Sequence, residues 1–411
     1  MTKLISNGAV TVEAANNICF LLNIVVALSS FWHAAVSRRM LLFCWCQNEE
    51  EDKKALNQRF EADLRRWSIS PESVKLERTA VLGRGTFGTV YAGTYTMSSN
   101  KTSDDDGCKM HVSVIDVAVK TMRCPPEMSR HRFLASLASE LRVHMTAWVD
   151  CPDLFVRAFG VFCASKSWWR GSSGIARLKQ PQDKEEAWCI VLERMDCTLS
   201  QQFSLWRNRQ LHKGPDIHKR AKICESLLNS VSYCHRALGI VHGDLKMNNY
   251  LVGRNGGGHL CYKLSDFGLS RNLQPGGLFK DNGRRQRLRG GDMQQTSARV
   301  WQPKKFWYSC RAGTAFADES VDVFAVAFIV CEVLFGKLDR GLVRQIKAKR
   351  MLVSLENRVP PDCAPVARLL QSILGFRGEG GEEGRRPFAN DIRILQAEVQ
   401  KLLNGPSSKE S

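Results

Sequence analysis

The residues best suited to chemistry lie close together in VHGDLKMNNYLV, residues 241–252, where Asp244 is followed by Lys246 and Asn249. A further carboxylate, Asp266, follows in the segment YKLSDFGL. Carboxylate and amide oxygens are ligands that Mg²⁺ prefers, and a carboxylate can also accept the proton of a hydroxyl group. A lysine ammonium stabilises negative charge that develops on phosphate oxygens. Such a set suits transfer of a phosphoryl group, in which a protein chiefly positions the nucleophile, the phosphates and the metal ions.

A glycine-rich segment, VLGRGTFGTVY at residues 81–91, precedes these residues by more than a hundred positions and contains Gly83, Gly85 and Gly88. The pattern GxGxxG alone is weak, because dinucleotide-binding turns that open a helix share it. Here β-branched and aromatic residues follow, beginning with Thr89 and Val90, so we expect a turn between two strands. Its backbone N–H groups could approach phosphate oxygens, and an ordinary hairpin is the alternative.

Three further segments predict the elements around this turn. VIDVAVK, residues 114–120, alternates as a strand that ends in Lys120, and residues 129–147 form a helical stretch with Glu140 in its middle. AWCIVLERMDCTLSQ, residues 187–201, is a buried strand running into a helix. The polar stretches 97–109 and 165–186 interrupt the pattern, and we expect loops there.

These motifs, in this order, resemble the protein kinase superfamily over about residues 76–403. The resemblance implies an α+β, bilobal protein-kinase-like fold, with a small β-rich N-lobe and hinge at 76–197 and a larger helical C-lobe at 198–403. Residues 1–70 would form an N-terminal extension, and 404–411 a tail.

The resemblance also implies ATP and Mg²⁺ as cofactors and assigns roles to the motif residues. Asp244 would orient the acceptor hydroxyl or accept its proton, and Lys246 would lie over the γ-phosphate. Asn249 and Asp266 would bind magnesium. Lys120 would hold the α- and β-phosphates, with Glu140 as its partner; a solvated helix glutamate is the alternative for Glu140.

The remaining positions that the resemblance assigns to the nucleotide come from the glycine turn, the strands and the hinge. They are Gly83, Gly85, Gly88, Val90, Ala118, Glu193, Met195 and Leu251. Glu193 and Met195 would offer backbone groups to adenine, beside Leu192 at the end of the strand.

Gly243 follows the histidine of the catalytic loop, and this residue leaves more than one class of phosphate acceptor open. The Asp-x-Lys spacing is similar to serine/threonine kinases, which implies protein substrates. Small-molecule phosphotransferases of the aminoglycoside and choline type often carry His-Gly-Asp, and a non-catalytic kinase-fold scaffold is a third interpretation. Many kinases have an arginine at this position, and it pairs with a phosphorylated residue of the activation loop. Because Gly243 cannot form this pair, we expect control by phosphorylation of that loop to be less important here.

The resemblance continues toward the C-terminus. ESVDVFAVAFIVCEVLFGK, residues 319–337, is similar to a buried kinase helix in which Asp322 would support the catalytic-loop backbone. RRPFANDI, residues 385–392, is similar to a late segment whose arginine usually pairs with the glutamate of Ala-Pro-Glu. Residues 307–316, WYSCRAGTAF, have no such motif, so either Arg386 pairs with another carboxylate, such as Glu319, or the substrate platform is built differently.

The formal net charge of +18 favours acidic partners. Many of the basic residues follow Gly268, which suggests recruitment of acidic protein substrates; nucleic acid is an alternative without further support, and a solvated loop is the plainer one. The 15 cysteines show no CxxC pair, as expected for free thiols in a reducing, cytoplasmic compartment.

Residues 18–36 are apolar and contain no Asp, Glu, Lys or Arg, and Arg38 and Arg39 follow. The segment has about the minimum length of a membrane anchor, and the arginines would keep the downstream chain in the cytosol. A buried or interfacial helix is the alternative. The oligomeric state is not predicted by the sequence.

Overall fold

The structure, a computed structural model, divides the chain into two units, Met1–Ala62 and Asp63–Ser411. It describes residues 58, 61–62, 64–85, 88–101, 109–126, 128–164, 168, 187–208, 216–273, 319–336, 359–374 and 389–404. The fold below is that of the second unit.

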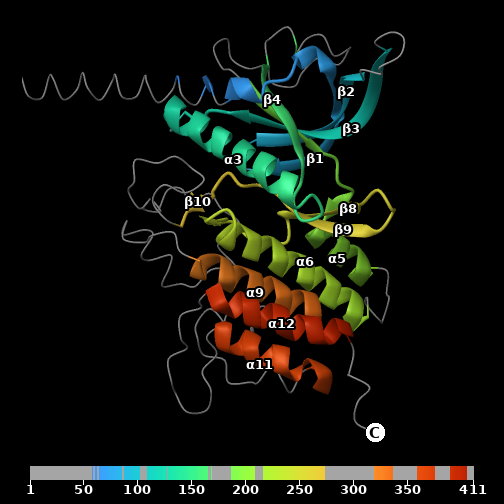
Figure 1. Cartoon of the computed structure of the whole chain (residues 1–411), viewed down its shortest axis with the longest axis vertical. Helices are drawn as coiled ribbons and strands as arrows, with labels where there is room; N and C mark the ends of the chain where they lie inside the picture. The colour runs from blue at the N-terminus through green and yellow to red at the C-terminus, as the bar shows by residue number, and fades with distance from the viewer. Residues whose placement is uncertain are drawn as a thin grey trace, which may run out of the picture. The chain divides into compact units, whose positions relative to one another are not determined.

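The N-terminal part of this unit is an antiparallel sheet in the order β1-β2-β3-β5-β4 (Figure 1). Its strands are β1 (Val74–Gly85), β2 (Gly88–Lys101), β3 (Lys109–Arg123), β4 (Ala158–Ala164) and β5 (Ala187–Glu193). One face of the sheet is packed as a small apolar core that includes Val117, Val119 and Val191. Alternation of β-branched residues along β3 places these side chains on one face, as the sequence predicted.

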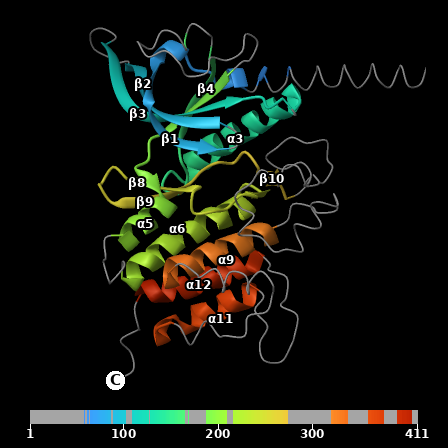
Figure 2. The ribbon, with the colours of Figure 1, turned by 180° about the vertical axis from the view of Figure 1, so that it is seen from behind.

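Helix α3 (Arg130–Asp150) lies alongside this sheet in both Figure 1 and Figure 2. Its buried residues include Leu134, Leu137 and Leu141, which recur at helical spacing and form its apolar face. The helix turns a polar residue, Glu140, inward among them. Such a buried carboxylate requires a partner, and that partner lies on the sheet.

The C-terminal part is helical. Its helices are α5 (Leu199–Asn208), α6 (Ile217–Arg236), α9 (Ser320–Phe335), α11 (Ala364–Ile373) and α12 (Ala389–Asn404), with short 3₁₀ helices η1 (Pro71–Ser73) and η4 (Pro361–Cys363) elsewhere in the unit. Residues Val321 to Leu334 of α9 are all buried, because the helix is apolar on every side and forms the centre of the large core.

Short strands join the sheet to the helices (Figures 1 and 2). They are β6 (Cys197–Thr198), β7 (Ile240–Val241), β8 (Tyr250–Arg254), β9 (Leu260–Leu264) and β10 (Arg271–Asn272). They pair as β6-β8-β9 and β7-β10. The catalytic loop therefore runs between β7 and β8, and the Asp-Phe-Gly segment follows β9.

The predicted α+β fold with a β-rich small lobe and a helical large lobe is confirmed. The predicted loop at residues 97–109 is shorter than expected, because β2 and β3 stay paired out to Lys101 and Lys109. Most of the predicted loop at 165–186 lies outside the described residues, as does the predicted membrane anchor at 18–36. Within the described residues, no helix has the length and apolar character needed to span a bilayer.

The segment just before β1 also belongs to the small lobe. Val161 on β4 donates its N–H to Trp67 O and accepts from Ile69 N, both at 3.0 Å. A Cβ on Gly160 would lie 2.5 Å from Ile69 Cγ2. Residues 67–69 therefore cover the outer edge of β4 at close range.

Candidate functional site

The glycine segment forms a hairpin between β1 and β2, as the sequence predicted, and does not open a helix. Gly85 and Gly88 are partners at the end of the hairpin. A Cβ on Gly88 would lie 1.8 Å from Thr121 O, so only glycine fits against β3. No atom of the described residues lies within 4 Å of a Cβ position on Gly83 or Gly85, which leaves space beside their backbone for a ligand.

The strand register gathers the predicted nucleotide residues of the sheet on one face. Val90 on β2 is opposite Lys120 on β3, and Ala118 is opposite Leu192 on β5. Directly opposite residues of antiparallel strands share a face, as do residues two apart. Val90, Ala118, Lys120 and Leu192 therefore point to the same side of the sheet.

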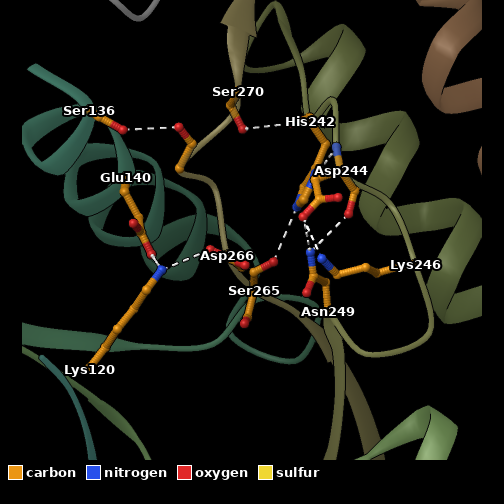
Figure 3. A network of polar contacts seen from close by, with 11 residues as sticks. Lys120, Ser136, Glu140, His242, Asp244, Lys246, Asn249, Ser265, Asp266 and Ser270 are labelled. Carbon is orange, nitrogen blue, oxygen red and sulfur yellow. Dashed lines mark hydrogen bonds and ion pairs between the residues drawn. The ribbon is translucent and has the colours of Figure 1, made fainter. Parts of the chain in front are cut away.

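Lys120 holds two carboxylates. Its Nζ lies 2.6 Å from Glu140 Oε1 on α3 and 2.8 Å from Asp266 Oδ1 after β9 (Figure 3). Burial would lower the pKa of Lys120, but the charges of Asp266 and Glu140 outweigh it and raise the pKa above its usual value. The ammonium therefore stays charged and ties the sheet, α3 and the Asp-Phe-Gly segment together.

The two carboxylates respond differently to this shared cation. Burial and the nearby charge of Asp266 raise the pKa of Glu140 despite the opposing charge of Lys120. Burial acts in the same direction on Asp266, but Lys120 and then Lys246 lower the pKa of Asp266 to about 2. The same cation therefore accompanies a lowered pKa at Asp266 and a raised pKa at Glu140.

Asp266 also has a rare backbone conformation, with φ of 67°. Non-glycine residues adopt this left-handed region at an energetic cost, often at functional sites. The bond to Lys120 helps to hold the residue there.

One face of α3 follows the Asp-Phe-Gly segment along three successive turns. Ser136 donates its hydroxyl to Gly268 O at 3.0 Å, Glu140 binds Lys120, and the His144 ring packs edge-on against Phe267 at 5.0 Å between centroids. Residues four apart lie on the same helix face. The position of α3 is thus coupled to that of Asp266.

The catalytic loop fixes the side chain of Asp244. Its Oδ2 accepts bonds from Lys246 Nζ at 2.7 Å and from Asn249 Nδ2 at 3.2 Å (Figure 3). Its Oδ1 is buried and has no hydrogen-bond partner among the described residues. Burial raises the pKa of Asp244, although Lys246 opposes this. One oxygen of this carboxylate therefore keeps its hydrogen-bonding capacity unused.

Asn249 is oriented by the same loop. Its Nδ2 also donates to Asp244 O at 2.8 Å, so the amide oxygen is the group that remains for a cation. Figure 3 shows Asp266 between the Lys120–Glu140 pair and this cluster. An amide oxygen and a carboxylate with a pKa of about 2 form a hard-oxygen donor set, which fits Mg²⁺.

Asp322, at the start of α9, supports the backbone of the catalytic loop, as predicted. Its two carboxylate oxygens accept the backbone N–H groups of His242 at 2.7 Å and Gly243 at 2.9 Å. Gly243 has φ of 78°, and a Cβ there would lie 3.1 Å from Leu269 O. Glycine thus fits a position that strains any other residue.

The hinge residues lie where β5 ends. Glu193 donates its N–H to Arg157 O at 2.8 Å, so this donor is not available to a nucleotide. The Met195 side chain packs over Gly253, whose Cβ would lie 2.8 Å from Met195 Cε. Leu251 is opposite Lys263, and Lys263 reaches Glu193, so Leu251 lies on the side of β8 that faces the hinge.

Several contacts were not predicted from the sequence: Lys120 with Asp266, Ser136 with Gly268, His144 with Phe267, and Lys263 with Glu193. The sequence does contain a signal for the contact of Lys263 with Glu193: a lysine stands between Tyr262 and Leu264 in an otherwise apolar strand, where it needs a partner. Arg386, residues 307–316 and the basic residues between 274 and 318 lie outside the described residues.

Comparison with known proteins gives a family match. A family model described as the protein kinase domain matches residues 169–353. Cyclin-dependent kinase-like 2 of Rattus norvegicus is 26% identical over 155 residues, which are 38% of this chain and 25% of that protein. Ephrin type-A receptor 1 of Mus musculus is 27% identical over 277 residues, 63% of this chain and 25% of that protein.

A shorter match is closer in sequence. A probable serine/threonine-protein kinase, MARK-C of Dictyostelium discoideum, is 46% identical over 59 residues, 14% of this chain and 7% of that protein. The chain spans about a quarter of the length of the first of these relatives. The fold and the site are those expected of the protein kinase superfamily, and these matches agree with that resemblance.

Proposed function

We propose that the chain transfers the γ-phosphate of Mg-ATP to serine or threonine hydroxyls of protein substrates. The observation that carries the proposal is Asp244 Oδ1, a buried carboxylate oxygen without a partner. The kinase relatives support protein phosphotransfer as the reaction class.

Asp244 acts on the acceptor. Its Oδ2 is held by Lys246 and Asn249, so Oδ1 can orient the acceptor hydroxyl and accept its proton as the new O–P bond forms. The raised pKa of Asp244 makes it a better proton acceptor. The bond from the γ-phosphorus to the bridging oxygen breaks, and ADP leaves.

The remaining residues position the phosphates. Lys120 supplies a fixed positive charge, which Glu140 keeps in place through α3. Asp266 and Asn249 would hold magnesium, which would neutralise charge on the phosphates. The backbone at Gly83 and Gly85 is open toward a ligand, and Val90, Ala118, Met195 and Leu251 would surround the adenine.

Two other functions compete with this proposal. Gly243 favours a small-molecule phosphotransferase, because His-Gly-Asp is common in that class. A non-catalytic scaffold would not need a carboxylate oxygen of Asp244 that is free to accept a proton.

The acceptor decides between them. We would incubate the full chain with Mg²⁺ and ATP labelled at the γ-phosphate, offering acidic and basic proteins and a panel of aminoglycosides, choline and related alcohols. The proposal expects label on serine or threonine. Label on a small alcohol alone would favour the second class, and ATP binding without any transfer would favour the scaffold.

A further inference from the structure

Three segments of the chain meet at the carboxylate of Glu193. Lys263 on β9 donates to both of its oxygens, at 2.7 Å to Oε1 and 2.9 Å to Oε2. The N–H of Arg157, in the connection from α3 to β4, donates to Oε2 at 3.1 Å. Glu193 returns a bond through its own N–H to Arg157 O.

Lys263 is buried for a lysine, with a side chain only 7% exposed, whereas the side chain of Glu193 is 27% exposed. A lysine pays a large desolvation cost in such a place unless a carboxylate binds it. An apolar residue would serve simple packing better at this position. The bidentate contact therefore points to a role beyond filling the strand.

The two ends of this ion pair lead to the two halves of the nucleotide site. Glu193 lies two residues before Met195 at the hinge. Lys263 lies three residues before Asp266, and the intervening Leu264 is bonded to the α3–β4 connection through Leu154 O and Val156 N. The ion pair thus links the adenine side of the site to its metal side by a short, rigid path.

We propose that Lys263 is a positioning residue: its ion pair with Glu193 sets the distance between the hinge and Asp266, so that one ATP molecule can use both at once. This proposal rests on the proposed function, since it assumes that the hinge binds adenine and that Asp266 binds the metal. Lys263 itself does not touch the reacting atoms.

Ligands of different length test this idea. Calorimetric titration of the full chain would compare Mg-ATP, which needs both halves of the site, with adenosine and with Mg²⁺-tripolyphosphate, which need one half each. In Lys263→Met we expect the Kd for Mg-ATP to rise about tenfold, while the Kd for each half-ligand changes less than about twofold. The double variant Lys263→Met/Glu193→Gln should bind Mg-ATP no more weakly than Lys263→Met does, since both variants remove the same contact.

Arg220→Met is the matched control, because Arg220 is also a partly buried cation and binds Leu334 O at 2.9 Å, in the helical part. It should lower the melting temperature without changing any of the three dissociation constants. Equal changes for all three ligands in Lys263→Met, or none, would reduce the ion pair to a structural role and overturn the proposal.

Should Lys263→Met fail to fold, Glu193→Gln alone decides, because glutamine keeps one acceptor for Lys263. A selective loss of Mg-ATP affinity, about threefold, supports the proposal, and an unchanged affinity overturns it. Failure of the shared assumption, that the hinge binds adenine and Asp266 binds the metal, gives a separate result: the wild-type chain would not bind Mg-ATP at all.

Discussion

The two oxygens of Asp244 have different surroundings, although they belong to one carboxylate. Oδ2 receives Lys246 and Asn249, whereas Oδ1 has no partner. The residues of this loop were predicted from their types and spacing. The contacts of Lys120 with Asp266 and of Lys263 with Glu193 were not, because they join segments far apart in the chain and depend on the folded arrangement.

The backbone conformation of Gly243 limits which residues can occupy this position. We predict that Gly243→Ala lowers the free energy of unfolding by about 1–2 kcal/mol, because φ is 78° and the new Cβ would crowd Leu269 O. Urea denaturation would measure the loss. Gly256→Ala is the control, since nothing lies within 4 Å of its Cβ position, and an equal loss there would contradict the explanation.

Asp322 makes part of the stability depend on pH. Burial would raise the pKa of Asp322, but the hydrogen bond and charge of His235 and the N–H of Gly243 lower it below its usual value. A carboxyl group whose pKa is lower in the folded state stabilises the fold above its unfolded pKa of about 3.9, and this contribution disappears as the pH falls through the lower folded pKa.

We therefore expect the free energy of unfolding to fall between about pH 5 and pH 3, and to fall less in Asp322→Asn. The free energy of unfolding of Asp322→Asn should also be lower by about 1–3 kcal/mol near neutral pH. An amide has only one oxygen, so it cannot accept the two backbone N–H groups as the two carboxylate oxygens do. Identical pH profiles for the two proteins would show that Asp322 does not carry this dependence.

At the scale of elements, periodicity located the helices well. The helical stretch 129–147, for example, corresponds to α3 (Arg130–Asp150). The sequence does not predict the long pairing of β2 and β3, because polar residues such as those at 97–109 are typical of loops. The attachment of residues 67–69 to β4 was missed because edge pairing between distant segments leaves no local pattern.

This attachment gives a prediction for the small lobe. Gly160→Ala would place a Cβ 2.5 Å from Ile69 Cγ2 and 2.8 Å from Trp67 O, so we expect a loss of about 1–3 kcal/mol in unfolding free energy. Chemical denaturation would measure it against Gly256→Ala. A neutral result at Gly160 would mean that residues 67–69 do not pack on β4 as described.

At the scale of the whole molecule, the fold class followed from the order of motifs, because each motif belongs to a particular element of the kinase fold. The formal net charge of +18 was equally plain in the sequence. The sequence does not show where this charge meets a partner, and many of the basic residues lie between residues 274 and 318, outside the described part.

The charge predicts a dependence on salt. We expect the KM for an acidic protein acceptor to rise severalfold between about 0.05 M and 0.3 M NaCl, because salt screens long-range attraction between exposed charges. The KM for a neutral acceptor of similar size should change much less. Equal salt effects on both would exclude electrostatic recruitment of acidic substrates.

The most direct test of the central claim is the single-turnover rate of phosphate transfer by the full chain and by Asp244→Asn, with Mg-ATP affinity measured on both. Asparagine keeps the size of the side chain but removes the basic oxygen, so we predict a rate lower by about 10² to 10⁴ with unchanged ATP affinity. An unchanged rate in Asp244→Asn would contradict the claim that Asp244 Oδ1 receives the acceptor proton.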